Sequence, residues 1–217
     1  MMLTLPGVYR AQEDTSLLID AMRSGSYARN RSVLDVGAGA GALSIAAAHA
    51  GASTVTAIDL SVRSVLATWL NSRLHGVGAS VRWGDLFQPV AGRRFDLIVT
   101  NPPYVPAHSG LLPRHRMARC WDAGPDGRLL LDRICDGAPA VLAEDGVLLL
   151  VQSELSGEDA TLTRLAAANL LATVTGRIRI PFGPVLRARE PLLRARGMLR
   201  PDQLDEELLV IEARRHG

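Results

Sequence analysis

The 217-residue sequence contains no lysine, so each of its 24 basic residues is an arginine. The absence of lysine excludes enzymes that use a Schiff-base lysine, a pyridoxal phosphate anchor or the lysine of a P-loop. Cysteine is also scarce, because Cys120 and Cys135 are the only two, and they match no metal-ligand spacing. We therefore expect no metal site and no disulfide framework.

Long apolar runs and a strong net charge are missing as well. No uninterrupted run reaches the roughly 20 apolar residues of a membrane span, and the amino terminus has no basic region followed by an apolar core. The net charge of +2 is too small to indicate nucleic-acid binding by itself. At this length the chain fits one folded unit. These features predict a single cytoplasmic domain that spans residues 1–217, with no membrane contact.

Strand-like and helix-like patterns alternate along most of the chain. The alternation predicts an α/β fold, with a seven-stranded, mostly parallel sheet and helices on both faces. Residues 1–30 form an amino-terminal helical segment in this prediction. The expected strands lie at 32–36, 53–58, 79–83, 95–100, 146–152, 172–180 and 207–213. The expected later helices lie at 42–50, 62–74, 128–143 and 156–170.

Local signals add detail to this outline. Ser61 is the expected N-cap of the helix that follows it, and Ser156 with Asp159 resembles a capping box. The segment 177–200, between the last two strands, carries seven arginines and three prolines. We expect a helical or irregular insertion there, and we interpret its charge as a solvated face more readily than as an acidic or nucleic-acid contact. Apolar residues form one stripe on the helix after Ser61, which predicts packing against the sheet: Val62, Val65, Leu66, Trp69, Leu70 and Leu74.

A glycine-rich turn follows the expected strand at 32–36. Its glycines, Gly37, Gly39 and Gly41, let the backbone approach a ligand without Cβ clashes, and the next helix adds donors at its amino end. Asp35, just before them, would sit poorly beside a pyrophosphate but would suit a cationic ligand. The pattern alone is also compatible with a tight turn between a strand and a helix.

Two aspartates end the next two strands. Asp59, followed by Leu60, stands where a carboxylate can accept hydrogen bonds from ribose hydroxyls. Asp85 ends the second of these strands and can accept the exocyclic amine of adenine, while Leu86 or Phe87 covers the ring. Together with a cationic group near Asp35, these residues outline a nucleoside that carries a positive charge. S-adenosylmethionine has this shape and charge.

The apolar run at 95–100 leads into Asn101-Pro102-Pro103-Tyr104. This tetrapeptide leaves the carboxyl end of the sheet, where open α/β sheets bind their ligands. Asn101 offers an acceptor and donors, while the two prolines remove two backbone donors. Such a loop can hold a planar amide or amino group by its N–H bonds and leave the nitrogen lone pair facing an electrophile.

With this motif added to the glycine-rich turn and the two aspartates, the sequence resembles class I S-adenosylmethionine-dependent methyltransferases, which have a Rossmann-like fold. Asn101–Tyr104, Val8–Thr15 and Trp121–Gly127 together are similar to the HemK family of protein glutamine N5-methyltransferases. The likeness is greatest to the short branch, which lacks an amino-terminal helical domain. It implies S-adenosylmethionine as the cofactor and the GGQ glutamine of a class I release factor as the methyl acceptor.

The resemblance also implies a role for single residues. It places Glu13 and Thr15 beside the methionine end of the cofactor. It implies that the side-chain oxygen of Asn101 and the carbonyl of Pro102 accept the two N–H bonds of the target amide, while Tyr104 contributes its ring face. The cofactor-binding residues expected from pattern and resemblance together are Glu13, Thr15, Asp35, Gly37, Gly39, Gly41, Asp59, Leu60, Asp85, Leu86 and Asn101.

A protein partner is implied on the same basis. Short-branch relatives work with a small zinc-binding activator protein that covers an exposed edge strand. The run at 79–83 is the candidate edge in this chain, and a partner could add a strand there.

The sequence is also compatible with other methyl acceptors. An adenine-N6 nucleic-acid methyltransferase would use the same loop, and phosphates would then meet Arg114, His115, Arg116 and Arg119. Against it, the chain has no evident target-recognition domain, and aromatic residues for holding a flipped base make up only 4%. A small-molecule N-methyltransferase would have the same loop. The glycine spacing disfavours a nicotinamide oxidoreductase, and the intact Asn101 loop disfavours a silent nucleoside-binding module.

Overall fold

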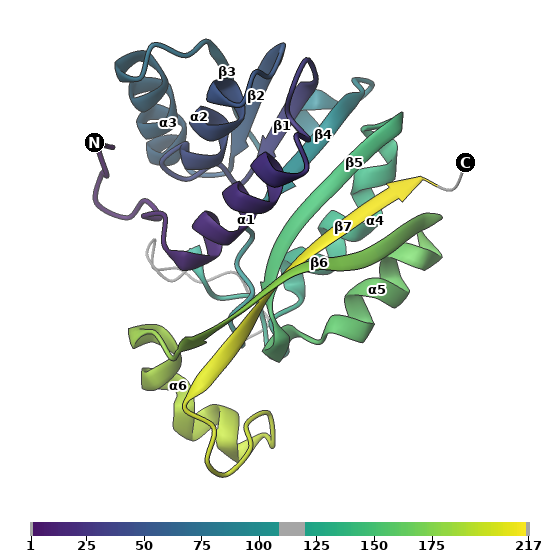
Figure 1. Cartoon of the computed structure of the whole chain (residues 1–217). Coiled ribbons are helices and arrows are strands. Elements are labelled where there is room, and N and C mark those ends of the chain that lie inside the picture. The colour runs from purple at the N-terminus through teal and green to yellow at the C-terminus, as the bar shows by residue number, and fades with distance from the viewer. Residues whose placement is uncertain (1, 109–119, 216–217) are drawn as a thin grey trace.

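The computed structural model describes residues 2–108 and 120–215 (Figure 1). Its described part contains one seven-stranded sheet. The strands are β1 (Ser32–Val36), β2 (Thr54–Asp59), β3 (Ala79–Trp83), β4 (Phe95–Thr100), β5 (Leu142–Ser153), β6 (Leu170–Pro181) and β7 (Asp205–Arg215). Their order in the sheet is β3-β2-β1-β4-β5-β7-β6. Strands β1 to β5 pair in parallel, whereas β7 runs antiparallel to both of its neighbours.

Helices cover both faces of this sheet (Figure 1). The helices are α1 (Glu13–Ser24), α2 (Ala42–His49), α3 (Val62–Leu74), α4 (Leu129–Gly137), α5 (Glu158–Ala167) and α6 (Pro184–Ala195). The first three lie on one face, α4 and α5 lie on the other, and α6 lies beyond the sheet at the tips of β6 and β7. The predicted α/β fold with a seven-stranded, mostly parallel sheet is therefore confirmed. None of the helices in the described part of the chain has the length and apolar composition of a membrane span.

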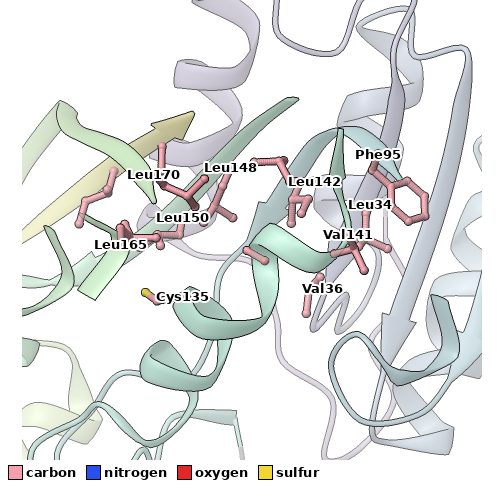
Figure 2. Packing of buried hydrophobic residues seen from close by; sticks show 14 of the residues in the cluster. Leu34, Val36, Phe95, Cys135, Val141, Leu142, Leu148, Leu150, Leu165 and Leu170 are labelled. Carbon is pink, nitrogen blue, oxygen red and sulfur yellow. The ribbon is translucent and has the colours of Figure 1, made fainter. Parts of the chain in front are cut away.

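Two apolar clusters hold the layers together. The central strands β1, β4 and β5 read as nearly continuous apolar runs because both of their faces are covered. Figure 2 shows Leu34, Leu148 and Leu150 of the sheet on the face that α4 and α5 cover, with Cys135 of α4 and Leu165 of α5 nearby. The second cluster joins the opposite face to α1 and α2. This packing leaves the carboxyl ends of β1 to β4 free to form a site.

The outward face of α3 is apolar, and the prediction that its apolar stripe packs against the sheet is wrong. Val62, Leu66, Trp69 and Leu74 are 46–65% exposed. The buried side of the helix carries small or polar residues instead: Ser64, Ala67, Thr68, Asn71 and Ser72.

The reason for this reversal is the close approach of α3 to the glycine-rich turn. A Cβ atom on Gly41 would lie 3.0 Å from the Thr68 Cγ2 atom, so only short side chains fit between α3 and the glycine-rich turn. The Thr68 hydroxyl donates to the Gly39 carbonyl at 3.0 Å, and the Asn71 amide donates to the Ala40 carbonyl at 2.8 Å. These bonds need polar side chains on the buried face.

Several boundaries also differ from the predictions. Helix α4 ends at Gly137, a 3₁₀ turn η3 (Ala138–Ala140) follows, and residues from Leu142 onward belong to β5. Ser61 is the N-cap of α3, as predicted, because its hydroxyl accepts from the Ser64 N–H at 3.4 Å.

The proposed capping box at the start of α5 is wrong. Helix α5 begins after Gly157, which has no side chain to cap it, and Ser156 closes the 3₁₀ turn η4 (Glu154–Ser156) instead. The Ser153 hydroxyl caps that short turn by accepting from the Leu155 N–H at 3.3 Å. The insertion predicted at 177–200 consists of the end of β6, then α6, then a loop that leads to β7.

Candidate active site

A cavity of about 530 Å³ opens at the carboxyl ends of β1 to β4. Its wall contains residues from the glycine-rich turn, the end of β2, the first turn of α3, the segment after β3 and the start of the loop after β4. The expected site residues on this wall are Gly37, Gly39, Asp59, Leu60, Asp85, Leu86 and Asn101. Each of these strand ends reaches the same edge because the strands are parallel.

Asp59 joins three parts of this wall. Its Oδ2 atom accepts from the Gly39 N–H at 2.9 Å, and its Oδ1 atom accepts from the Ser61 N–H at 2.7 Å. Burial raises the pKa of this carboxyl above its ordinary value. Because each carboxylate oxygen has two lone pairs, Asp59 still has acceptor capacity for hydroxyl groups in the cavity.

Asp35 is not on the cavity wall. It is fully buried, and its Oδ2 atom accepts from the Ser44 hydroxyl at 2.6 Å and from the Ser44 N–H at 3.0 Å. Burial raises the pKa of Asp35 to about 7. The structure therefore places this carboxylate behind the glycine-rich turn, where it holds the first turn of α2. Gly41 does not line the cavity either. It is the N-cap of α2 and has a φ of 90°.

Asp85 shares the cavity with a cation that sequence reasoning missed. Arg133 of α4 lines the cavity, and its Nη2 atom lies 2.6 Å from the Asp85 Oδ2 atom. The two residues are 48 positions apart, so no local pattern connects them. Leu86, beside Asp85, has a φ of 47° and adds an apolar surface to the wall.

The loop after β4 is tied to α1 by hydrogen bonds. The Asn101 amide nitrogen donates to the Thr15 hydroxyl at 3.1 Å. The Tyr104 hydroxyl donates to the Asp14 Oδ2 atom at 3.0 Å, and the Tyr9 hydroxyl donates to the same carboxylate at 2.7 Å. Sequence reasoning did not single out Tyr9 or Asp14, although both lie within the quoted segment Val8–Thr15.

Other expected residues lie farther from the cavity. Glu13 is exposed and does not line it, while Thr15 is buried behind Asn101. Pro103 lines the cavity, whereas Pro102 is buried and Tyr104 packs between the core clusters. The basic residues expected to meet phosphates lie outside the described residues: Arg114, His115, Arg116 and Arg119.

The arginine-rich insertion braces the loop that follows Asn101. Arg189 pairs with Asp122 and donates to the Pro106 carbonyl at 2.8 Å. Arg196 donates to the carbonyls of Ala107 and Pro125 at 3.0 and 2.8 Å. For these two arginines neither the solvated-face interpretation nor the external-contact interpretation holds. An apolar cluster supports the same contact: Val105, Phe182, Leu186, Leu193 and Leu199.

Comparison with known proteins identifies the family to which the chain belongs. Residues 1–117 match the methyltransferase small domain family. A Methanocaldococcus jannaschii protein assigned as a protein N5-glutamine methyltransferase is 34% identical over 177 residues, which cover 82% of this chain and 88% of the relative. The chain belongs to the protein N5-glutamine methyltransferase family. This family uses S-adenosylmethionine for methyl transfer, and the chain is an enzyme of that class.

Other members of the N5-glutamine methyltransferase family are longer. The release factor glutamine methyltransferase of Xylella fastidiosa is 34% identical over 172 residues, which cover 76% of this chain and 62% of that protein. The corresponding Geobacter sulfurreducens enzyme is 32% identical over 155 residues, 67% of this chain and 53% of that protein. The chain therefore spans only part of these bacterial methyltransferases.

Solved methyltransferase structures share the fold. The E. cuniculi Mtq2-Trm112 complex, described as responsible for methylation of eRF1, matches with a TM-score of 0.68 and 21% identity, covering 97% of this chain and 99% of the other. The T. thermophilus 16S rRNA methyltransferase RsmC, solved with AdoMet and guanosine, matches with a TM-score of 0.65 and 22% identity over 98% of this chain and 46% of the other. Both matches support the class I, Rossmann-like methyltransferase fold.

Proposed function

We propose that this enzyme transfers a methyl group from S-adenosylmethionine to the side-chain amide nitrogen of a protein glutamine, of the GGQ type found in release factors. The observation that carries the proposal is the anchoring of Asn101 on the cavity wall. Its amide nitrogen donates to Thr15 at 3.1 Å, so its side-chain oxygen stays available as an acceptor. We also propose that residues 1–217 act as one methyltransferase domain, since a single sheet joins elements from both ends of the chain.

The cavity residues suit S-adenosylmethionine as the cofactor. Asp59 keeps acceptor capacity for ribose hydroxyls, and Asp85 lies two residues after the neighbouring strand β3, where it can accept an exocyclic amine. Leu86 and Leu130 supply apolar wall for an aromatic base. When bound, this cofactor supplies an electrophilic methyl group next to a positively charged sulfur.

The protein contributes by positioning the acceptor. An amide nitrogen is a poor nucleophile because its lone pair is delocalised into the carbonyl group. We propose that the Asn101 side-chain oxygen and the Pro102 carbonyl accept its two N–H bonds, which orients the lone pair and stabilises the positive charge that develops on nitrogen. Tyr104 does not line the cavity and supports this loop instead, because its hydroxyl donates to the Asp14 Oδ2 atom at 3.0 Å. The proton then leaves late, so no strong base is required.

The test is a transfer assay with labelled S-adenosylmethionine. A purified class I release factor, its variant with the GGQ glutamine changed to alanine, and duplex DNA are offered side by side. Label that requires the glutamine supports the proposal. Label on DNA would establish the adenine-N6 alternative, and label on none of them, with cofactor bound, would point to a small molecule or another protein.

Two substitutions separate acceptor positioning from cofactor binding. We expect Asn101→Ala to abolish transfer while leaving cofactor affinity within about 3-fold, because it removes an acceptor for the substrate. Asp59→Ala should weaken cofactor binding, measured by calorimetry, whereas Asp145→Ala, at an exposed position near the start of β5, should change neither property. Equal methylation by wild type and Asn101→Ala would refute the proposed role.

We further propose that a small partner protein, of the zinc-binding activator class, adds a strand to β3. Within the described sheet β3 is an edge strand, paired only with β2, and its last residue Trp83 is 64% exposed. The apolar stripe of α3 lies beside it, and a contiguous exposed apolar surface at a sheet edge is typical of a docking site. The Mtq2 structure was solved as a complex with Trm112, which supports a protein partner for this chain.

Solubility and partner capture test this second proposal. A variant with Leu66→Glu and Trp69→Glu should lose a co-expressed activator in pull-down, while Leu171→Glu, on the exposed side of β6, should retain it. Both designs replace exposed apolar residues, so folding is not expected to differ between them. A wild-type protein that is monomeric, stable and fully active when expressed alone would contradict the proposal.

A further inference from the structure

Asp14, the second residue of α1, binds three segments of the chain together. Its side chain is only 7% exposed. The carboxylate accepts from the Tyr9 hydroxyl at 2.7 Å, from the Tyr104 hydroxyl at 3.0 Å and from the Thr15 N–H at 2.5 Å. A carboxylate buried to this extent is costly unless several donors satisfy it. Asp14 therefore meets the amino-terminal segment, α1 and the loop after β4 at one point.

The charge of this carboxylate fixes the direction of both tyrosine hydroxyls. An ionised carboxylate only accepts hydrogen bonds, so Tyr9 and Tyr104 must both donate to Asp14. Burial, followed by the negative charge of Asp14, raises the pKa of both phenols above the ordinary value. Both tyrosines consequently stay neutral, and both hydroxyl groups continue to donate hydrogen bonds to Asp14.

Each of the groups bonded to Asp14 touches a different part of the site. Tyr9 lines the cavity and packs over the glycine-rich turn, where a Cβ atom on Gly39 would lie 3.5 Å from the Tyr9 Cβ atom. Tyr104 ends the motif that contains Asn101. Thr15, whose N–H donates to Asp14, uses its hydroxyl to accept from the Asn101 amide. One side chain thus sets both the cofactor side and the acceptor side of the cavity.

We propose that Asp14 is a positioning residue for methyl transfer, holding Tyr9 over the cofactor cavity and, through Tyr104 and Thr15, the Asn101 loop against the acceptor. This inference rests on the proposed function. Asn at position 14 keeps the shape but replaces one acceptor oxygen with a donor, so it cannot accept from both hydroxyls and the Thr15 N–H as the carboxylate does.

The experiment compares Asp14→Asn, Tyr104→Phe and the double variant, with Asp20→Asn on the exposed side of α1 as the matched control. We expect Asp14→Asn to lower kcat by roughly 30-fold, because small misplacements of reacting groups have effects of this size. The cofactor Kd, measured by calorimetry, should weaken much less than kcat falls, because Tyr9 still packs against the glycine-rich turn in this variant. The kcat of the double variant should be no lower than that of the poorer single variant, since both changes break the same hydrogen bond between Asp14 and Tyr104.

A spectroscopic measurement tests the network without any turnover. Alkaline titration of tyrosinate absorbance should show two of the three tyrosines ionising at lower pH in Asp14→Asn than in wild type. Tyr27 should not move, because it bonds to Glu212 instead. If wild type methylates no glutamine but the titration shifts as expected, the proposed function fails and the network stands. Unchanged kcat, additive losses in the double variant, or a cofactor Kd that weakens as much as kcat falls would each overturn the positioning role.

Discussion

Glu206 makes the stability of this protein depend on pH. It is the second residue of β7, is 6% exposed, and its Oε2 atom has no hydrogen-bond partner among the described residues. Burial, with smaller contributions from the negative charges of Asp14 and Glu154, raises its pKa from 4.5 to about 7. The nearby Ser153 hydroxyl opposes this shift without cancelling it.

The sign and size of the effect follow from proton linkage. Between its unfolded and folded pKa values, the native state holds a proton on Glu206 that the unfolded state has released. The stability that the protonated form of Glu206 gives to the native state is fully present below pH 4.5 and is lost as the pH rises through about 7. A shift of this size corresponds to about 3 kcal/mol of unfolding free energy. Glu206→Gln keeps the shape and cannot ionise, so it should exceed wild type by about 3 kcal/mol at roughly pH 8 and match it at about pH 4.

Urea unfolding of both proteins across this pH range measures the difference directly. Glu144→Gln is the matched control because Glu144 is exposed, and its free energy of unfolding should follow wild type at every pH. Asp35, whose pKa is also raised to about 7, is present in all three proteins and cancels in the comparison. The reasoning is refuted if Glu206→Gln differs from wild type by the same amount at every pH.

Two further predictions concern the loop after the NPPY motif. In Gly127→Ala the new Cβ atom would lie 2.3 Å from the Tyr104 carbonyl oxygen, whereas Gly76, also with positive φ, has open space around it. Chemical unfolding should therefore show Gly127→Ala to be destabilised by at least about 2 kcal/mol more than Gly76→Ala, whose cost is the backbone strain alone. Arg189→Met leaves Asp122 unpaired and should lower the free energy of unfolding by about 2 kcal/mol. We expect faster hydrogen exchange in this loop, with cofactor affinity retained. Unchanged exchange would contradict this prediction.

The sheet could be predicted from the sequence because its signals are local. Apolar runs such as Phe95–Thr100 have strand length, are bounded by turn residues and have both faces covered. The placement of Asp59, Asp85 and Asn101 on one cavity follows from the same outline, since consecutive parallel strands deliver their carboxyl ends to one edge. Knowledge of three-dimensional contacts was not needed for that step.

The errors arise where long-range packing overrides periodicity. The apolar stripe of α3 has the period of a buried face, yet Thr68 and Asn71 occupy the buried side because they bond the glycine-rich turn at short range. Arg133 reaches Asp85 from 48 positions away, and Arg189 reaches Asp122 from 67 positions away. Charge composition alone cannot reveal such pairings, since it is equally compatible with a solvated surface.

The position of α3 gives the enzyme a route for communication between its two surfaces. Val62 and Arg63, in its first turn, form part of the cavity wall, and the backbone of Ser61 is bonded to Asp59. The outward side of the same helix carries Trp69. A protein that docks there contacts the same helix that borders the cavity, so α3 connects the two surfaces physically. Linkage is reciprocal, so any change that the docked protein causes in cofactor affinity is matched by an equal change that the cofactor causes in the affinity for that protein.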